Sequence, residues 1–181
     1  MAEFLIKDIQ SKTLKDQKFF VDTNVWIFNF LYSKKSFDLE YENKQKMEGY
    51  SQFIEDVLEN GGQLYTSPLC LTELAYRLEN FEYSSNKNLT LKEFRSIKEK
   101  RGKVINEIEL TWKEIESLVS GVLDLCIDHR TPANILNEMK SYPLDSYDAM
   151  LFMTMKKHKI TNLVSDDKDF RQKSDIDVYH I

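Results

Sequence analysis

The stretch FFVDTNVWIFNF, residues 19–30, changes its hydrophobic periodicity within a few residues. It begins with the apolar run at 19–21, which is typical of a short buried strand. After a polar cluster, apolar residues recur with helical spacing at Val25, Trp26, Phe28 and Leu31. We therefore expect a strand that turns directly into a helix, with Asp22 at the end of the strand and Thr23 as the helix N-cap.

Strand and helix alternate again in the next part of the chain. An amphipathic helix over about 44–60 is ended by Gly61-Gly62, and the segment QLYTS at 63–67 predicts a short strand. Ser67-Pro68 then indicates a helix start, because Ser is a good N-cap and Pro fits the first helical position. This unit therefore repeats the order of the first.

The C-terminal part of the chain supplies the remaining elements. Thr131-Pro132 starts a short helix, and the segment DSYDAMLFMTMKKH at 145–158 predicts a helix apolar enough to be central. TNLVS at 161–165 and DVYHI at 177–181 predict two strands. Alternating strands and helices favour parallel pairing. We expect one α/β domain over 1–181, a three-layer α/β/α fold around a parallel sheet of four to five strands.

Composition narrows the class of protein. Of 181 residues, 41% are hydrophobic and 30% are charged, with 5 Gly and 3 Pro, which excludes collagen-like and disordered chains. The polar leading segment 1–18 contains no signal peptide or membrane span. Its apolar residues predict one short helical face: Phe4, Leu5, Ile6 and Ile9. We expect a cytoplasmic protein with no membrane partner, in which Cys70 and Cys126 are reduced core residues.

The section at about 82–132 is expected to form a helical arm inserted into the domain. Thr90 and Glu93 form a capping box, and apolar residues then recur every three or four positions. This pattern predicts one long helix or a hairpin of two helices, with Gly102 as the break.

Acidic residues occur where strands are expected to end or helices to start. Asp22 follows the first strand, Glu73 lies in the first turns of the helix after QLYTS, and Asp148 lies near the start of the apolar helix. The strand TNLVS is followed by Asp166, Asp167 and Asp169. In open α/β sheets, ligands bind at this edge of the sheet.

Carboxylates that converge on one cleft repel one another unless a divalent cation neutralises them. Mg²⁺ or Mn²⁺ suits a set of oxygen ligands with no histidine or cysteine. Such an ion activates water and stabilises the charge on a phosphate under attack. The chemistry that the acids predict is phosphodiester hydrolysis.

Each acid also has a purely structural interpretation. Asp22, Asp145 and Asp167 suit helix caps or turns, and Glu73 and Asp148 suit the first turn of a helix. The joint placement of the acids at one edge of the sheet favours a site.

Other phosphate chemistries lack their residues. The sequence has neither of the glycine-rich nucleotide loops GxxxxGK[ST] and GxGxxG. Asn24 occupies the position where a phosphoaspartyl phosphatase needs a second Asp. His129, His158 and His180 lie in polar or terminal contexts and are interpreted as surface residues.

Four segments resemble the PIN domain family, metal-dependent nucleases that include the VapC toxins of toxin–antitoxin pairs. They are VDTNV (21–25), SPLCLTELAYRL (67–78), DSYDAMLFMTMKKHKI (145–160) and LVSDDKDF (163–170). The resemblance implies the three-layer fold and a metal-dependent endoribonuclease that hydrolyses RNA.

The resemblance also implies roles for single residues. Asp22, Glu73 and Asp148 correspond to metal-binding carboxylates, and the fourth acid comes from the SDDKDF turn. In the family's usual form of this turn, Ser165 leads to Asp167, with Asp166 and Asp169 as rivals. Asn24 is then a supporting residue that holds Asp22 or the metal-bound water.

A toxin–antitoxin role would bring two protein partners, an antitoxin and a second copy of the chain. Two alternatives stand beside the ribonuclease: a non-catalytic PIN-like RNA-binding or scaffold protein, and a DNA nuclease of the flap-endonuclease type. Both keep the same fold and differ in what the acids do.

One segment departs from the overall charge of −5. Residues 87–103 hold seven basic residues against two acidic ones, a local charge of +5. We expect this part of the arm to bind RNA phosphates, chiefly through Lys92, Arg95, Lys98 and Arg101. The alternative is a solvated helix face with no ligand.

Overall fold

A computed structural model describes residues 2–32, 40–86, 88–125, 127–172 and 174–181. Its centre is a six-stranded sheet in the order β1-β6-β5-β2-β3-β4, and every pair of neighbours is parallel. The α/β fold with a parallel sheet is therefore confirmed, with one strand more than the upper expectation. The strands are β1 (Glu3–Leu5), β2 (Lys18–Val21), β3 (Gln63–Thr66), β4 (Gly121–Val122), β5 (Asn162–Val164) and β6 (Asp177–His180).

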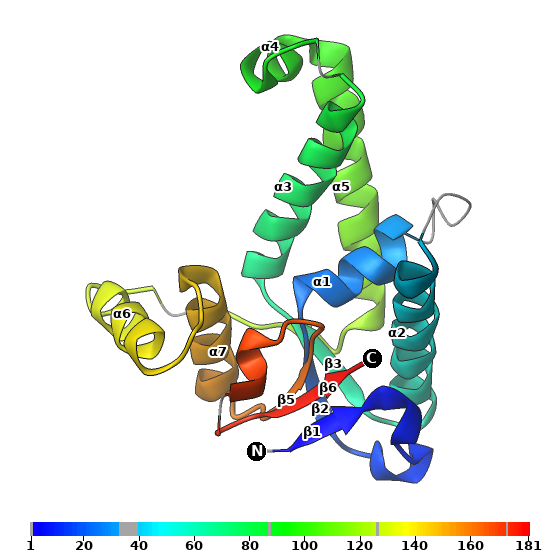
Figure 1. Ribbon diagram of the computed structural model, residues 1–181, viewed down its shortest axis with the longest axis vertical. Helices are drawn as coiled ribbons and strands as arrows, with labels where there is room; N and C mark the ends of the chain where they lie inside the picture. Colours follow the sequence, from blue (N-terminus) through cyan, green and yellow to red (C-terminus); the bar gives the residue numbers. More distant parts are fainter. Residues whose placement is uncertain (1, 33–39, 87, 126, 173) are drawn as a thin grey trace.

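Helices lie on both sides of this sheet. Figure 1 shows α2 on one side and α6 and α7 on the other, which gives the three layers. The helices are α1 (Thr23–Trp26), α2 (Tyr41–Glu59), α3 (Pro68–Ser84), α4 (Leu91–Ser96), α5 (Lys98–Leu118), α6 (Thr131–Ser141) and α7 (Ser146–His158). Among the described residues, none of the helices is both long and apolar enough to cross a membrane.

The core forms where the apolar runs predict it. Phe19, Phe20 and Val21 of β2 are fully buried, and the apolar face of α7 contributes Leu151 and Met155 to the same cluster. Cys70 is buried and free, as expected, whereas Cys126 lies outside the described residues.

The prediction of a helical face in the leading segment is wrong. Residues Glu3–Leu5 form the edge strand β1, which pairs with β6 so that Phe4 lies opposite Tyr179. The two rings stack with their centroids 4.8 Å apart. The partner strand lies more than a hundred residues further along the chain, so local periodicity could not reveal the pairing.

Part of the inserted section forms, together with α3, an arm that projects from the sheet (Figure 1). The expected helical arm ends earlier than residue 132, because Gly121–Val122 return to the sheet as β4 beside β3. Helices α3 and α5 run side by side, and α4 caps the tip. The predicted capping box of Thr90 and Glu93 starts α4. The predicted break at Gly102 is wrong, because Gly102 lies inside α5 and the chain turns at Ile97, whose backbone is extended.

Candidate functional site

The candidate site lies where the connections of the sheet change direction. Strand β2 pairs with β3 on one side and with β5 on the other. The strand order therefore runs in opposite directions from β2, towards β3 and β4 on one side and towards β5 and β6 on the other. Such a switch point opens a crevice at the carboxyl ends of the strands. A pocket of about 620 Å³ lies here, and its lining includes six carboxylates: Asp22, Glu73, Asp145, Asp148, Asp166 and Asp167.

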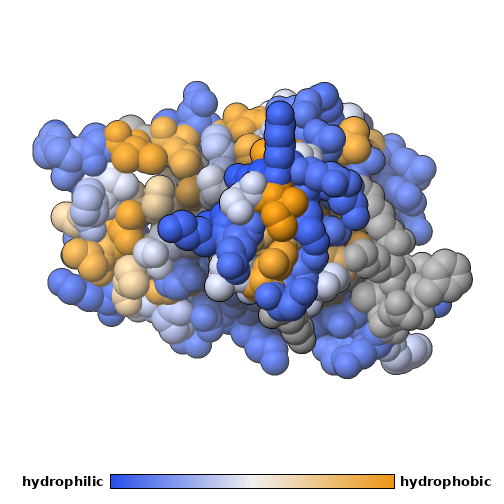
Figure 2. Space-filling view, turned by 90° about the horizontal axis from the view of Figure 1, so that it is seen from above, coloured by the Kyte–Doolittle hydropathy of each residue, from blue (hydrophilic) through white to orange (hydrophobic). Residues whose placement is uncertain are grey.

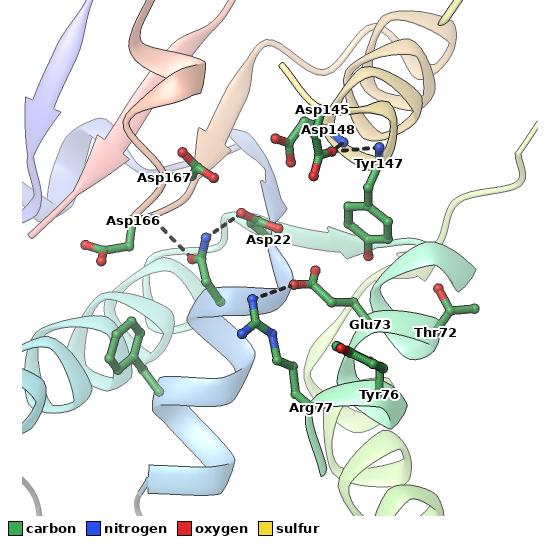
Figure 3. Close-up of a pocket in the computed structure, with 12 residues that line it drawn as sticks. Asp22, Thr72, Glu73, Tyr76, Arg77, Asp145, Tyr147, Asp148, Asp166 and Asp167 are labelled. Carbon is green, nitrogen blue, oxygen red and sulfur yellow. Dashed lines mark hydrogen bonds and ion pairs between the residues drawn. The ribbon is translucent and has the colours of Figure 1, made fainter. Parts of the chain in front are cut away.

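All four acids predicted as metal ligands line this one pocket (Figure 3). Asp22 directly follows β2, and Asp167 follows β5 by a few residues. Glu73 lies in the second turn of α3, and Asp148 lies in the first turn of α7. The four side chains therefore come from four separate segments of the chain.

Asp22 both starts a helix and faces the pocket. It is the N-cap of α1, and its Oδ1 accepts a hydrogen bond of 2.6 Å from the backbone N–H of Thr23. The expected cap, Thr23, is instead the first helical residue, because an Asp side chain one position earlier reaches the free N–H. Thr23 Oγ1 lies 3.1 Å from the hydroxyl oxygen of Tyr147.

A hydrogen-bond network joins the end of β2 to the turn after β5. Asn24 Nδ2 donates to Asp22 Oδ2 at 2.6 Å, and Ser165 Oγ donates to the same oxygen at 2.7 Å. The backbone N–H of Asp166 donates to Asn24 Oδ1, and that of Asp167 donates to Ser165 Oγ. The position of Asp22 relative to the turn is therefore fixed by side chains from both segments.

The pocket disfavours the ionised form of two of its acids, Asp22 and Asp148. Burial raises the pKa of Asp22 to about 7, and the charges of Glu73 and Asp167 add to the rise against the hydrogen bond from Ser165. Burial also raises the pKa of Asp148 to about 8, with contributions from Asp145, Asp22 and Asp167. A bound cation would relieve this excess of negative charge.

The three candidates for the fourth acid have different surroundings. Asp166 is already engaged, because its carboxylate lies 3.1 Å from Lys46 Nζ and accepts a hydrogen bond from the Tyr50 hydroxyl. Asp169 is exposed, and its backbone N–H donates to Asp167 Oδ1 at 2.8 Å. Asp167 lines the pocket and, within the part of the chain that the structure describes, forms no ion pair with a basic side chain, which favours it as the fourth acid.

The donor set fits a hard divalent cation. Every acid in the pocket offers oxygen, and Mg²⁺ and Mn²⁺ prefer oxygen ligands. In the part of the chain that the structure describes, no three His, Cys, Asp or Glu residues are already arranged to hold an ion. Ionised carboxylates repel one another, which opposes such a close arrangement.

Several residues of the pocket were not singled out from the sequence. Arg77 lies one helical turn after Glu73, and its Nη2 is 3.5 Å from Glu73 Oε1. Tyr76 and Tyr147 add aromatic rings to the lining. Helical spacing from Glu73 would have placed Tyr76 and Arg77 on the same face of α3, whereas nothing local indicates Tyr147.

The basic residues predicted to bind RNA lie elsewhere. Lys92, Arg95, Lys98 and Arg101 are on α4 and the first turn of α5, at the far end of the arm from the start of α3 (Figure 1). Arg95 Nε and Arg101 Nη1 both donate to Oε1 of the buried Glu79, at 2.9 and 2.6 Å. Lys92 and Lys98 are exposed. From above the arm, the surface is mostly hydrophilic, with apolar residues scattered over it (Figure 2).

Residues 19–176 match the PIN domain family. No curated protein matches the chain. Among solved structures, the chain is similar to one in the crystal structure of VapBC2 from Rickettsia felis bound to a DNA fragment from their promoter, with 12% identity and a TM-score of 0.53 over 91% of this chain and 100% of that one. A toxin–antitoxin complex from Klebsiella pneumoniae has 16% identity and a TM-score of 0.45, over 87% and 93%.

Proposed function

The chain belongs to the PIN domain family, whose members are typically nucleases, and we propose that it is a metal-dependent endoribonuclease that hydrolyses RNA phosphodiester bonds. One observation carries the proposal: four acids from separate segments converge on one pocket, where Asp22 and Asp148 have raised pKa values. A domain that only binds RNA gains nothing from carboxylates that repel one another and the RNA.

In this proposal, Asp22, Glu73, Asp148 and Asp167 hold Mg²⁺ or Mn²⁺. When bound, the cation supplies a water of lowered pKa and neutralises charge on the phosphate. The residues of the chain prepare the site for it. Asn24 and Ser165 hold Asp22 Oδ2 in place, so the carboxylate does not need to be ordered when the substrate arrives.

Ionisation is part of the same mechanism. With raised pKa values, Asp22 and Asp148 are substantially protonated near neutral pH in the metal-free protein. Ligation needs the carboxylate form, so metal binding releases protons from this pocket. Affinity for the cation is therefore expected to rise between pH 6 and pH 8.

We further propose that the tip of the arm binds RNA phosphates at a distance from the pocket. Lys92 and Lys98 are exposed there, and α3 is 17 residues long, so the arm extends by about 25 Å. Arg95 and Arg101 also carry charge to the tip, but their pairing with Glu79 gives them a structural role in addition. A solvated helix face without a ligand is the alternative.

The proposed setting is a toxin–antitoxin pair in the cytoplasm. The similar fold in Rickettsia felis belongs to a VapBC2 complex bound to promoter DNA, which supports an antitoxin partner for this chain by analogy of fold. A homodimer belongs to the same proposal. Co-expression with the product of a small neighbouring reading frame, followed by co-purification, tests for the antitoxin.

The function itself is tested with purified protein on matched RNA and DNA of the same sequence, with Mg²⁺, Mn²⁺ or EDTA. We expect cleavage of RNA that requires either metal, internal cuts, and little cleavage of DNA. Preference for branched DNA would support the flap-endonuclease alternative. Binding of RNA without cleavage, and without stabilisation by either metal in a thermal melt, would support a scaffold protein.

A further inference from the structure

One wall of the pocket differs in chemistry from its acidic floor. The first turns of α3 present Thr72, Glu73, Tyr76 and Arg77 to the pocket, at spacings of three and four residues (Figure 3). We call Thr72, Tyr76 and Arg77 the α3 ledge. It is the part of the lining that combines a hydroxyl, an aromatic ring and a cation.

Arg77 is the only cation among the described residues that line the pocket, and it faces six carboxylates. Its ion pair with Glu73 is long, at 3.5 Å, and its side chain is 59% exposed. A surface pair of this kind contributes little and breaks easily. Lys46, the cation beside Asp166, is held more closely by Glu42 at 2.9 Å and Asp166 at 3.1 Å. The guanidinium of Arg77 is therefore the group that can turn to an incoming phosphate.

Tyr76 is an exposed ring beside this cation. It is 59% exposed, whereas Tyr50 is completely buried. Exposure of a large ring at the rim of a charged pocket leaves one face free for stacking. Nucleobases stack on such rings regardless of base identity, provided that they are not paired with another strand.

We propose, on the basis of the nuclease function above, that the α3 ledge selects unpaired RNA. Arg77 binds a phosphate next to the one that is cleaved, through two parallel N–H···O bonds, and Tyr76 stacks on the adjoining base. A base within a duplex cannot stack on Tyr76 without leaving its partner. The ledge therefore gives the acidic pocket both its attraction for RNA and its preference for single strands.

The test compares ledge variants with matched controls from outside the pocket. Arg77→Ala is matched by Lys113→Ala, because Lys113 is also an exposed cation paired with an acid four residues away on a helix. Tyr76→Leu is matched by Tyr41→Leu, a change at another exposed tyrosine. Arg77→Lys and Tyr76→Trp are the conservative variants.

Steady-state cleavage of a short unpaired RNA is the first measurement. Arg77→Ala and Tyr76→Leu are each expected to raise KM about tenfold with little change in kcat, because they remove phosphate binding and stacking. Tyr76→Trp should restore KM, and Arg77→Lys should restore it only in part, since the ammonium lacks the planar fork. The two controls should behave as the unchanged protein.

A spectroscopic measurement detects stacking directly. In the Asp148→Asn background, where RNA is expected to stay intact, 2-aminopurine is placed at each position of the RNA in turn. One position should lose fluorescence on binding, and Tyr76→Leu should abolish the loss whereas Tyr41→Leu should not. A merely structural role for Tyr76 would not produce a position-specific signal.

The outcomes separate the ledge from the nuclease function. Cleavage by the unchanged protein, together with ledge variants that match their controls in KM and fluorescence, overturns the ledge alone. If the unchanged protein neither binds nor cleaves RNA with either metal, the ledge and the proposed function both fail. Loss of RNA binding in the ledge variants of a protein that does not cleave RNA supports the ledge and overturns the nuclease.

Discussion

The pKa values of buried carboxylates are raised in the pocket and lowered in the arm. In the pocket, burial raises the pKa values of Asp22 and Asp148 to about 7 and about 8. In the arm, the hydrogen bond from Arg95 and the charges of Arg95 and Arg101 lower the pKa of Glu79, which is 5% exposed. The chain places two cations beside the buried carboxylate that joins α3 to α4 and α5, whereas the charges that shift the pKa values of Asp22 and Asp148 are those of other acids.

The largest expected effect is on catalysis. Asp148→Asn should reduce RNA cleavage by about 10³-fold or more, because several kcal/mol of charge stabilisation depends on the metal. The carboxylate of Asp148 accepts a hydrogen bond from the backbone of Asp145, which the side-chain oxygen of Asn can also accept. The network around Asp22 runs through Asn24 and Ser165, so Asn at position 148 should leave it intact. Cleavage rates with Mg²⁺ and Mn²⁺ measure the effect. Activity close to that of the unchanged protein would remove Asp148 from the site.

The next largest effect should be loss of stability in the arm. Glu79→Gln leaves two guanidinium groups without a counter-charge and is expected to cost about 1–3 kcal/mol. Urea unfolding measures the cost, and Glu82→Gln is the control, since Glu82 has a single long contact of 3.5 Å with Lys103. Equal stability of the two variants would show that the ion pairs of Glu79 with Arg95 and Arg101 do not stabilise the arm.

The two regions should respond to pH with opposite signs. The folded pKa values of Asp22 and Asp148 lie above their usual value of 3.8, so the unfolded chain ionises first as pH rises. Their contribution to stability is therefore complete below about pH 4 and is lost towards pH 8. For Glu79, whose folded pKa lies below the usual value of 4.5, the contribution to stability is present above about pH 4.5 and is lost as the pH falls through the folded pKa.

Metal-free protein should accordingly become less stable between pH 5 and pH 8, and Mg²⁺ should reverse this loss. Asp148→Asn should flatten the pH dependence and stabilise the metal-free protein at pH 8 by about 1–2 kcal/mol. Urea unfolding at both pH values, with and without Mg²⁺, measures it. Glu116→Gln, at an exposed position of α5, is the control. A pH dependence that is the same in both variants would argue against repulsion in the pocket.

The smallest expected effect concerns the tip of the arm. Lys92→Glu together with Lys98→Glu should weaken RNA binding several-fold. It should also reduce the dependence of binding on salt, because a protein that contacts fewer phosphates releases fewer counterions when it binds. Neither lysine takes part in the ion pairs of Glu79 with Arg95 and Arg101, so the free energy of unfolding should not change. Fluorescence anisotropy across a range of salt concentrations is the measurement. An unchanged salt dependence would leave the tip as a solvated helix face.

The sequence predicted helix starts correctly where the residues that make the stabilising contacts lie within a few positions of one another. The start of α3 at Ser67-Pro68, the capping box of α4 and the start of α7 after Asp145 are all confirmed. Each depends on contacts between residues at most four positions apart. The strands β2, β3, β5 and β6 are likewise confirmed where the segments FFV, QLYTS, TNLVS and DVYHI predict them.

Features that depend on distant partners were missed or left open. Strand β1 exists because β6 pairs with it, and the arm turns at Ile97, between Arg95 and Arg101, which both bind Glu79 on α3. The choice among the acids after β5 depends on Lys46, which engages Asp166 from α2. No local pattern contains that information.

The bonds from Ser165 and Asn24 to Asp22 also order events during synthesis. Ser165 and Asp22 are 143 residues apart in the chain. A nascent chain must therefore extend beyond Ser165 before the carboxylate of Asp22 gains this hydrogen bond. The pocket is therefore complete only after the last strands of the sheet, β5 and β6, begin to be synthesised.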